Sequence, residues 1–291
     1  MSNLLYGTVV KGLGGVFDVM CNKDVYVCVA PKKLRYGDSD VLVGDKVSFT
    51  LEGKKGVISK VLPRKNRMAR PEVANIDIAF ILVTVSPAPD LSLVDKILVN
   101  CFHNNITPVV VVSKSDIADD DFLKRIHDNY DKVCDVVSIS AHNNDVSALL
   151  HYIDGNTVCF AGQSAVGKTS LLNALVPNLN KAVGGLSHKT GRGRHTTRSS
   201  IVYSVGNGFV VDTTGFSMLE VTDTVSTSLM LYYDDFMQLS GGCRFKMCTH
   251  ISEPDCAVKK AVEEGNICKE RYDRYVTLFG ELAEKEKNKY K

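Results

Sequence analysis

One segment constrains the fold of this chain more than any other. Residues 162–169 read Gly-Gln-Ser-Ala-Val-Gly-Lys-Thr, which matches the pattern GxxxxGK[ST] of a phosphate-binding loop. An apolar run precedes it at 157–161, and a helical pattern follows at 170–175, so the loop has the strand–loop–helix context that it requires. The chain is therefore predicted to contain an α/β domain that binds a nucleoside triphosphate.

The chemistry of this loop follows from its residue types. Gly162 and Gly167 permit a tight turn whose backbone N–H groups face the phosphates. Lys168 supplies a cation to the β- and γ-phosphates and is a candidate catalytic residue, and the Thr169 hydroxyl is a candidate Mg²⁺ ligand. The predicted nucleotide-binding residues of the loop are Gly162, Gln163, Ser164, Ala165, Val166, Gly167, Lys168, Thr169 and Ser170.

Composition limits the class of protein. The 291 residues are enough for two or three domains, and 44% apolar with 23% charged residues is ordinary for a globular protein. The net charge of +2 means that any contact with nucleic acid must come from local basic patches. No apolar run could cross a bilayer, and the N-terminus does not read as a signal peptide. Nine cysteines then indicate reduced thiols or a metal site, and we expect a cytoplasmic protein.

The pattern along the chain predicts three domains. Residues 1–63 hold five short β-type runs separated by turn residues, which favours an all-β OB-fold barrel that binds RNA, with another β-meander as the alternative. Residues 64–75 form a basic connector, either a solvated linker or a contact for an RNA backbone. Residues 76–225 alternate strands and helices and predict a mostly parallel sheet, and 226–291 read as a mostly helical domain.

A candidate for reading the base lies upstream of the phosphate loop, whereas in most GTPases it lies downstream. It is the run Ser113-Lys114-Ser115-Asp116, which follows a buried strand pattern at 108–112. A carboxylate at Asp116 can accept from the N1–H and the 2-amino group of guanine together, and the Lys114 stem can pack on the base. Ser140 and Ala141, after the next strand, would support the base through a backbone N–H. The core is therefore predicted to be a circularly permuted GTPase.

Further residues are expected around the γ-phosphate. Asp212 and Gly215 form a DxxG motif after an apolar strand, with Asp212 as a Mg²⁺ ligand and the Gly215 N–H as a γ-phosphate sensor. Residues 189–198 are glycine-rich and basic, as a switch loop would be, and Thr196 or Thr197 could complete the Mg²⁺ shell. Phe216 stands where many GTPases place a glutamine that orients water, so His195 is the candidate for that role, with a merely exposed histidine as the alternative.

A cluster of soft ligands follows in the predicted helical domain. Cys243, Cys248, His250 and Cys256 fall within fourteen residues, which suits a closed tetrahedral zinc site. Four protein ligands leave no open position, so the predicted role of Zn²⁺ is structural. The remaining cysteines are scattered and are interpreted as ordinary reduced thiols.

These residues together resemble the RsgA/YjeQ family of circularly permuted GTPases, which assist maturation of the small ribosomal subunit. The most specific pieces are residues 64–66, 70–71 and 74–77 of the connector, the switch Gly-Arg-Gly-Arg-His-Thr-Thr at 191–197, and the spacing Cys-x₄-Cys-x-His-x₅-Cys with Glu253-Pro254 inside it. The resemblance implies an OB barrel, a permuted GTPase core and a zinc-bearing C-terminal domain. Two positions depart from the family pattern, because Thr214 is commonly Pro and Ser113 is usually Asn or Thr.

The resemblance also implies a function. It implies GTP hydrolysis stimulated by the 30S subunit, contact with 16S rRNA, release near the end of assembly, and a role for His195 in hydrolysis. From the motif order we expect a shift at Gly215 to move the zinc domain relative to the barrel, so that nucleotide state controls association. The rival interpretations are an RNA-binding module that holds guanine nucleotide as a structural ligand, and an ATP-using accessory of a nuclease or helicase. We expect a monomer.

Overall fold

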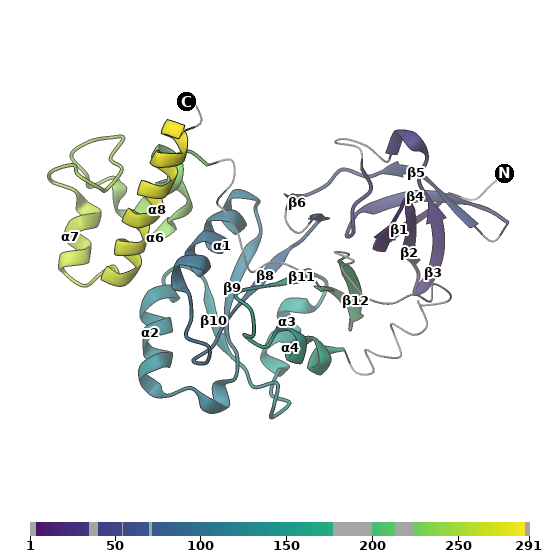
Figure 1. Cartoon of the computed structure of the whole chain (residues 1–291), viewed down its shortest axis with the longest axis horizontal. Coiled ribbons are helices and arrows are strands. Elements are labelled where there is room, and N and C mark those ends of the chain that lie inside the picture. Colours follow the sequence, from purple (N-terminus) through teal and green to yellow (C-terminus); the bar gives the residue numbers. More distant parts are fainter. Residues whose placement is uncertain are drawn as a thin grey trace.

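The computed structural model describes residues 4–34, 40–53, 55–69, 72–176, 200–212, 221 and 224–288. Figure 1 shows three parts that follow the sequence: a β-barrel near the N-terminus, a central sheet with helices on it, and a helical part at the C-terminal end. Among the described residues, no helix is both long and apolar enough to cross a membrane.

The first part is a closed barrel of strand order β1-β2-β3-β5-β4. Alternate residues of these strands point inward, and Val19, Phe49 and Ile58 are fully buried there. This confirms the expected OB-like barrel. The strands are β1 (Leu5–Leu13), β2 (Val16–Cys21), β3 (Asp24–Val29), β4 (Lys46–Glu52) and β5 (Lys55–Val61), with a short 3₁₀ turn η1 (Lys32–Leu34) after β3.

The described residues of the basic connector contact both of its neighbours, the barrel and the core. It contains the hairpin β6 (Arg67–Ala69) and β7 (Glu72–Ala74). Arg64 forms an ion pair with the fully buried Asp45 of the barrel at 2.7 Å, and Lys65 pairs with Asp77 at 2.6 Å. The connector is therefore more than a solvated linker. At Arg64 and Lys65 its cations are paired with aspartates of the protein and not exposed as free phosphate contacts. Its charges hold the barrel and the core to it.

The central sheet has the order β10-β9-β8-β11-β13-β12. All neighbouring strands are parallel except β12 and β13, which form the antiparallel hairpin expected from the sequence. Their bounds are β8 (Ile78–Val83), β9 (Thr107–Val112), β10 (Asp135–Ser138), β11 (Thr157–Ala161), β12 (Ile201–Val205) and β13 (Gly208–Asp212). The carboxyl ends of β8, β9, β10, β11 and β13 lie at one edge of this sheet, where ligands bind in open α/β folds.

Helices cover both faces of the sheet. Consecutive residues of a strand point to opposite faces, and in the central strands both sets are apolar. Ala79 and Ile81 of β8 pack with α1 and α2, whereas Phe80 and Leu82 pack with α3 and α4. The helices are α1 (Leu91–His103), α2 (Asp120–Tyr130), α3 (Leu150–Ile153) and α4 (Lys168–Leu175), with 3₁₀ turns η3 (Ser115–Ile117) and η4 (Ser147–Leu149). This double covering explains why β8, β9 and β11 are continuous apolar runs.

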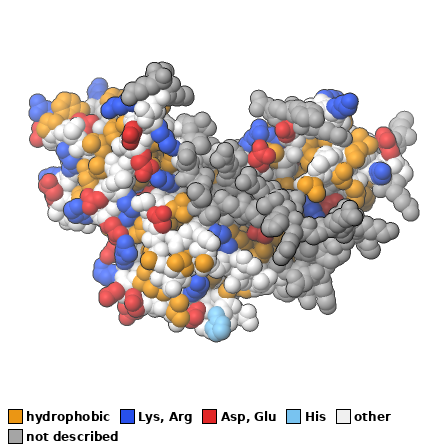
Figure 2. All heavy atoms as spheres, viewed as in Figure 1, with side chains coloured by type: hydrophobic (Ala, Val, Ile, Leu, Met, Phe, Trp, Pro, Cys, Tyr) orange, Lys and Arg blue, Asp and Glu red, His pale blue; other side chains and the backbone are white. Residues whose placement is uncertain are grey.

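The C-terminal part consists of η5 (Ser226–Tyr232), α6 (Asp234–Ser240), α7 (Ala257–Glu263) and α8 (Lys269–Asn288). It has its own apolar cluster around Tyr233, Phe236 and Tyr275. In Figure 2, basic and acidic side chains are interspersed over this part and the neighbouring α2. This face therefore carries no dominant charge of one sign among the described residues.

Buried ion pairs fix α8 to the central domain. Asp95 of α1 accepts from Arg271 at 3.0 Å and from Arg274 at 2.5 Å, and both Asp95 and Arg271 are 2% exposed. Arg271 also pairs with Asp235 of α6 at 3.2 Å. Burial alone would lower the pKa of Arg271, but Asp235 and Asp95 outweigh it and hold that pKa above its ordinary value. The C-terminal part is therefore joined to the core by desolvated charges rather than by a loose tether.

Candidate nucleotide site and metal centre

The phosphate loop lies between β11 and α4, as its sequence context predicted. Gly162 has φ +123°, and a Cβ there would lie 2.5 Å from the carbonyl oxygen of Leu82 in the neighbouring strand. Gly167 has φ +100° and precedes the first residue of α4. Both glycines are thus required by backbone geometry, since side chains rarely tolerate this region. Ala165 also has a positive φ, +64°, which its residue type did not signal.

Lys168 and Asp212 lie near enough to each other at the phosphate end of the site for each charge to affect the pKa of the other group. The Lys168 ammonium donates to the carbonyl oxygens of Gly162 and of Gln163, the latter at 2.8 Å. Burial lowers the pKa of Lys168 while Asp212 opposes this shift, and burial raises the pKa of Asp212 while Lys168 opposes it. Asp212 ends β13, the parallel neighbour of β11, so a carboxylate and an ammonium group flank the loop.

The Gln163 side chain serves a different purpose from its neighbours in the loop. It accepts from the backbone N–H of Asp90 at 2.8 Å and donates to the carbonyl of Ala88 at 2.9 Å. Asp90 in turn caps α1 by accepting from Leu93 N–H. The side chain therefore ties the phosphate loop to the start of α1, and only the backbone of Gln163 remains for a nucleotide.

Ser113 and Lys114 connect the end of β9 to the phosphate loop. The buried Ser113 hydroxyl donates to the carbonyl of Val166 at 2.5 Å, with the Val83 carbonyl 3.1 Å away as a second acceptor. The Lys114 ammonium donates to the carbonyls of Ser86 and Ala165 at 2.8 and 3.1 Å. A serine thus makes the cross-loop hydrogen bond in the position where Asn or Thr was expected.

Asp116 lies beside the residues that follow β10. Its Oδ1 accepts from the Ser140 hydroxyl at 2.5 Å. This hydrogen bond is the main reason that the pKa of Asp116 lies below its ordinary value, and the charges of His142 and Lys114 add to it. Ser140 is held in place by two backbone hydrogen bonds with Asp145, at 3.0 and 2.9 Å. The carboxylate is therefore kept ionised and oriented at the end of the sheet.

These segments share one cavity of about 590 Å³. That volume suits a nucleoside, because pockets for small ligands typically span about 300–1,000 Å³. Residues from three separate segments line it: Ser113, Lys114 and Asp116; Ala141, His142 and Asn144; and Gly167 and Ser170. The structure thus brings the candidate base-reading residues next to the phosphate loop. His142 and Asn144 were not predicted, although their position directly after Ser140-Ala141 could have indicated them.

Several predicted residues cannot be placed. His195, Thr196, Thr197, Gly215 and Phe216 lie outside the described residues.

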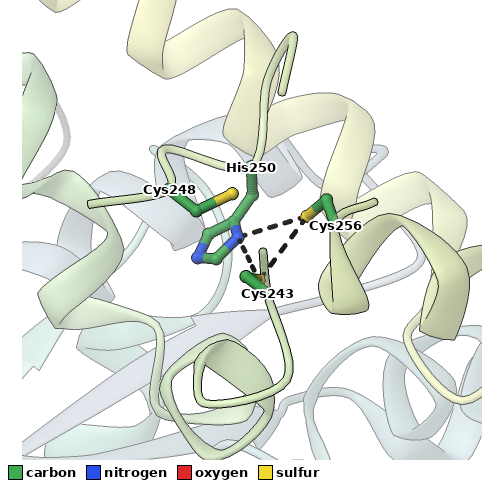
Figure 3. A group of neighbouring side chains, drawn as sticks. All are labelled: Cys243, Cys248, His250 and Cys256. Carbon is green, nitrogen blue, oxygen red and sulfur yellow. Dashed lines mark hydrogen bonds between the residues drawn. The ribbon is translucent and has the colours of Figure 1, made fainter. Parts of the chain in front are cut away.

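The second constellation is the cysteine and histidine cluster (Figure 3). One potential ligand atom from each of Cys243, Cys248, His250 and Cys256 lies within 4.8 Å of all the others. The His250 Nδ1 is 3.4 Å from the Cys256 sulfur and 3.7 Å from the Cys243 sulfur, and those two sulfurs are 3.9 Å apart. A tetrahedral zinc ion would place such atoms about 3.6–3.8 Å apart, given Zn–S and Zn–N bonds near 2.3 and 2.0–2.1 Å. The three measured distances are close to these values, and the four side chains together could hold a metal ion.

The loop that carries these ligands has its own supports. Glu253 accepts from the Thr249 N–H and hydroxyl, both at 2.7 Å, and from the Ile251 N–H at 3.1 Å. Burial would raise the pKa of Glu253, but these hydrogen bonds outweigh it and bring the pKa to about 2. Tyr272 of α8 donates to the carbonyl of His250 at 2.7 Å. A carboxylate and a tyrosine therefore fix the backbone on both sides of the histidine ligand.

Comparison with known proteins decides the family. Residues 61–222 match the RsgA GTPase family and residues 6–58 match the RsgA N-terminal domain. The first match covers more than half of the 291 residues. The chain belongs to the RsgA GTPase family.

Relatives of this family resemble the chain over its whole length. A small ribosomal subunit biogenesis GTPase RsgA from Caldanaerobacter subterraneus subsp. tengcongensis is 39% identical, covering 99% of both chains. The RsgA of Clostridium beijerinckii is 36% identical over 98% of this chain and 99% of its own length.

Two solved structures share the fold. YjeQ from Thermotoga maritima has a TM-score of 0.82 at 34% identity, covering 96% of this chain and 99% of its own. YloQ, described as a circularly permuted GTPase, has a TM-score of 0.80 at 30% identity, covering 97% of this chain and 96% of its own. The permuted core expected from the motif order is therefore confirmed.

Proposed function

We propose that this chain hydrolyses GTP and that it assists late maturation of the 30S ribosomal subunit. The observation that supports this most strongly is the single cavity lined by Asp116 and by Gly167 and Ser170. A guanine base at Asp116 would extend its ribose and phosphates toward the loop. Adenine offers no matching pair of donors to that carboxylate, so the cavity favours GTP over ATP. The names of the relatives place their own activity in small-subunit biogenesis.

Each residue has a proposed task in this reaction. Asp116 selects guanine, Lys114 packs on the base, and Ser140 and Ala141 support the base edge. The backbone N–H groups of residues 162–169 hold the phosphates, and Lys168 stabilises the charge that develops on the γ-phosphate. Lys168 now donates to carbonyls of its own loop and would exchange them for phosphate oxygens on binding.

The phosphate end also suits a magnesium ion. Thr169, Asp212 and one of Thr196 and Thr197 would hold Mg²⁺, which neutralises charge on the β- and γ-phosphates when bound. Gly215 would sense the γ-phosphate, and His195 would orient the attacking water. Because Phe216 cannot hydrogen-bond water, we expect slow intrinsic hydrolysis that a partner accelerates.

For the cysteine cluster we propose one structural Zn²⁺ held by Cys243, Cys248, His250 and Cys256. Three thiolates and an imidazole are the preferred donors of zinc, and all four positions are filled by protein. We further propose a monomer that acts in the cytoplasm and contacts 16S rRNA through its barrel. Residues 1–63, 64–75, 76–225 and 226–291 are the proposed domains.

Nucleotide state would control association with the subunit. The DxxG motif is followed in the chain by η5. The N–H and hydroxyl of Ser226 in η5 donate to the carboxylate of Glu286 in α8. The Tyr232 hydroxyl of η5 lies 2.8 Å from Nδ1 of His103 in α1. We propose that a shift at Gly215 is passed along the chain to η5, which begins at Ser226. Because Asp95 fixes α8 to α1, the C-terminal part should move together with the core when the nucleotide changes.

The test is a GTP turnover assay with and without purified 30S subunits. We expect slow turnover alone, clear stimulation by the subunits, and neither in Lys168→Ala. A protein that binds GTP but never turns it over, with or without subunits, would instead be the RNA-binding module that uses guanine nucleotide as a structural ligand. Equal affinity for 30S subunits with GDP and with a non-hydrolysable GTP analogue would contradict control by nucleotide state.

A further inference from the structure

A second cavity lies at the seam between the barrel and the core, away from the nucleotide site. Its volume is about 800 Å³, and its walls come from β1, the β2–β3 turn, β4 and the β12–β13 hairpin. Figure 1 shows β12 at the edge of the sheet nearest the barrel. Nothing in the proposed GTPase reaction uses this seam, although its volume would accommodate a nucleotide.

The walls of the seam are held by direct contacts between the two domains. The Lys46 ammonium of the barrel lies 5.4 Å from the centre of the Phe209 ring of the core and donates to Thr8 at 2.9 Å. The Ser204 hydroxyl donates to the sulfur of Met20 at 3.3 Å. The hairpin is held to the core by a hydrogen bond from the Phe209 N–H to the carbonyl of Asn156 at 2.8 Å. Gly208 lies so close to Ile153 that an added Cβ would be 1.8 Å from the Ile153 carbonyl oxygen. The seam is therefore a preformed cavity.

The side chains around the seam have a one-sided chemistry. Lys23 and Lys46 line it, and no Asp or Glu is among the described residues of its lining. The nearby Asp77 is engaged with Lys65 at 2.6 Å. Tyr6 also lines the seam and is 59% exposed, so most of its ring is available for contact. Two cations and an open aromatic face form the combination that binds single-stranded nucleic acid without sequence preference.

We propose that this seam binds a nucleotide of single-stranded RNA, with its base stacked on Tyr6 and its phosphate held by Lys23 and Lys46. An acidic peptide would satisfy the lysines but would leave the tyrosine face without a flat partner, so RNA fits the whole set better. The proposal deepens the proposed function by giving the RNA partner a location at which barrel and core both contribute. A ligand there would be sensitive to any change in the angle between the two domains.

The experiment measures binding of a fluorescein-labelled single-stranded RNA, twelve uridines long, by anisotropy between 50 and 200 mM KCl, with the full zinc-loaded chain and saturating GDP. Stacking on an aromatic ring is worth about 1–3 kcal/mol per base, so Tyr6→Ala should weaken binding at least about fivefold. Tyr6→Phe keeps the ring and should stay within about twofold of the unaltered protein. Lys46→Ala should reduce the slope of log K against log salt by about 0.7.

The matched control is Lys55→Ala. Lys55 of β5 lies opposite Glu52, at the other end of β4 from Lys46 and roughly 20 Å away from it. Its replacement should leave both the affinity and the salt slope unchanged. Unchanged binding in both Tyr6→Ala and Lys46→Ala would overturn the proposal, as would a lysine effect with no tyrosine effect, which indicates a merely electrostatic surface. The same assay is run with a single-stranded DNA of twelve thymidines. If this DNA bound as tightly as the RNA, the assignment to RNA would be overturned.

Basal GTP turnover of each variant separates the two proposals. Tyr6 and Lys46 are remote from the nucleotide cavity, so turnover should match that of the unaltered chain. Lost RNA binding with normal turnover supports the seam. Intact RNA binding with normal turnover refutes the seam and leaves the GTPase standing, whereas absent turnover in the unaltered chain refutes the GTPase alone.

Discussion

The buried pair between α1 and α8 gives a quantitative prediction for Asp95→Asn. This change keeps the shape of the side chain but removes the charge that accepts from Arg271 and Arg274. Removing one partner of a buried ion pair costs about 3–5 kcal/mol. The two arginines keep Asp235 at 3.2 Å and Glu270 at 3.6 Å, so we expect the lower end, about 3 kcal/mol.

That cost converts into a measurable shift of the melting temperature. The unfolding entropy near 60 °C is about 2.1 cal/mol/K per residue, so 291 residues that melt together give about 0.6 kcal/mol/K and a loss of about 5 °C. Differential scanning calorimetry of the zinc-loaded protein measures this directly. Because the pair is desolvated, the loss should persist in 0.5 M KCl.

The control is Asp128→Asn on α2. Asp128 pairs with Lys124 at 2.5 Å, but the two side chains are 54% and 72% exposed. Solvent screens such an exposed pair and it contributes little to stability, so the expected shift is under about 1 °C. Equal shifts of the melting temperature in Asp95→Asn and Asp128→Asn would show that buried charges do not join the C-terminal part to the core.

Three further changes probe the two sites. Ser113→Ala removes the buried hydrogen bond to the Val166 carbonyl, worth about 1–2 kcal/mol, and should weaken GDP binding about 5- to 30-fold by calorimetric titration. An unchanged affinity would show that this hydrogen bond does not position the phosphate loop for the nucleotide. Ser140→Ala removes the main cause of the low Asp116 pKa. Binding needs the ionised carboxylate and is lost as pH falls through that pKa, so the acid midpoint of GDP affinity should move to higher pH, while Ser147→Ala should not move it. Glu253→Ala should weaken Zn²⁺ retention against a chromophoric chelator about 10- to 100-fold, whereas the exposed Glu264→Ala should release zinc like the unaltered protein.

The sequence predicted what depends on neighbouring residues. The glycine spacing of the phosphate loop and the spacing of the three cysteines and one histidine are local patterns with one chemical solution each. The buried strands could also be predicted, because β8, β9 and β11 are apolar on both faces and form continuous apolar runs in the sequence. The closeness of Asp116 to the phosphate loop was inferred from motif order and strand ends.

The contacts that the sequence did not reveal join residues that are distant along the chain. Asp95 and Arg271 are 176 residues apart, and nothing local marks either as buried. From the sequence, Arg64 is indistinguishable from the other cations of the connector. Its partner Asp45 lies 19 residues earlier, inside the barrel, so no local pattern links the two. The sequence predicts Gln163 as part of the phosphate site, yet its side chain forms hydrogen bonds with the segment before α1. Each pairing depends on tertiary packing, which composition and periodicity do not encode.

The most direct test of the account is nucleotide choice in Asp116→Asn. An amide in place of the carboxylate donates where guanine donates, but it matches the carbonyl at position 2 of xanthine. We expect affinity to shift from GDP toward xanthosine diphosphate in this variant, with Lys168→Ala losing both ligands. Undiminished GDP affinity in Asp116→Asn would show that base and phosphates are not held in this one cavity, and the proposed site would be wrong.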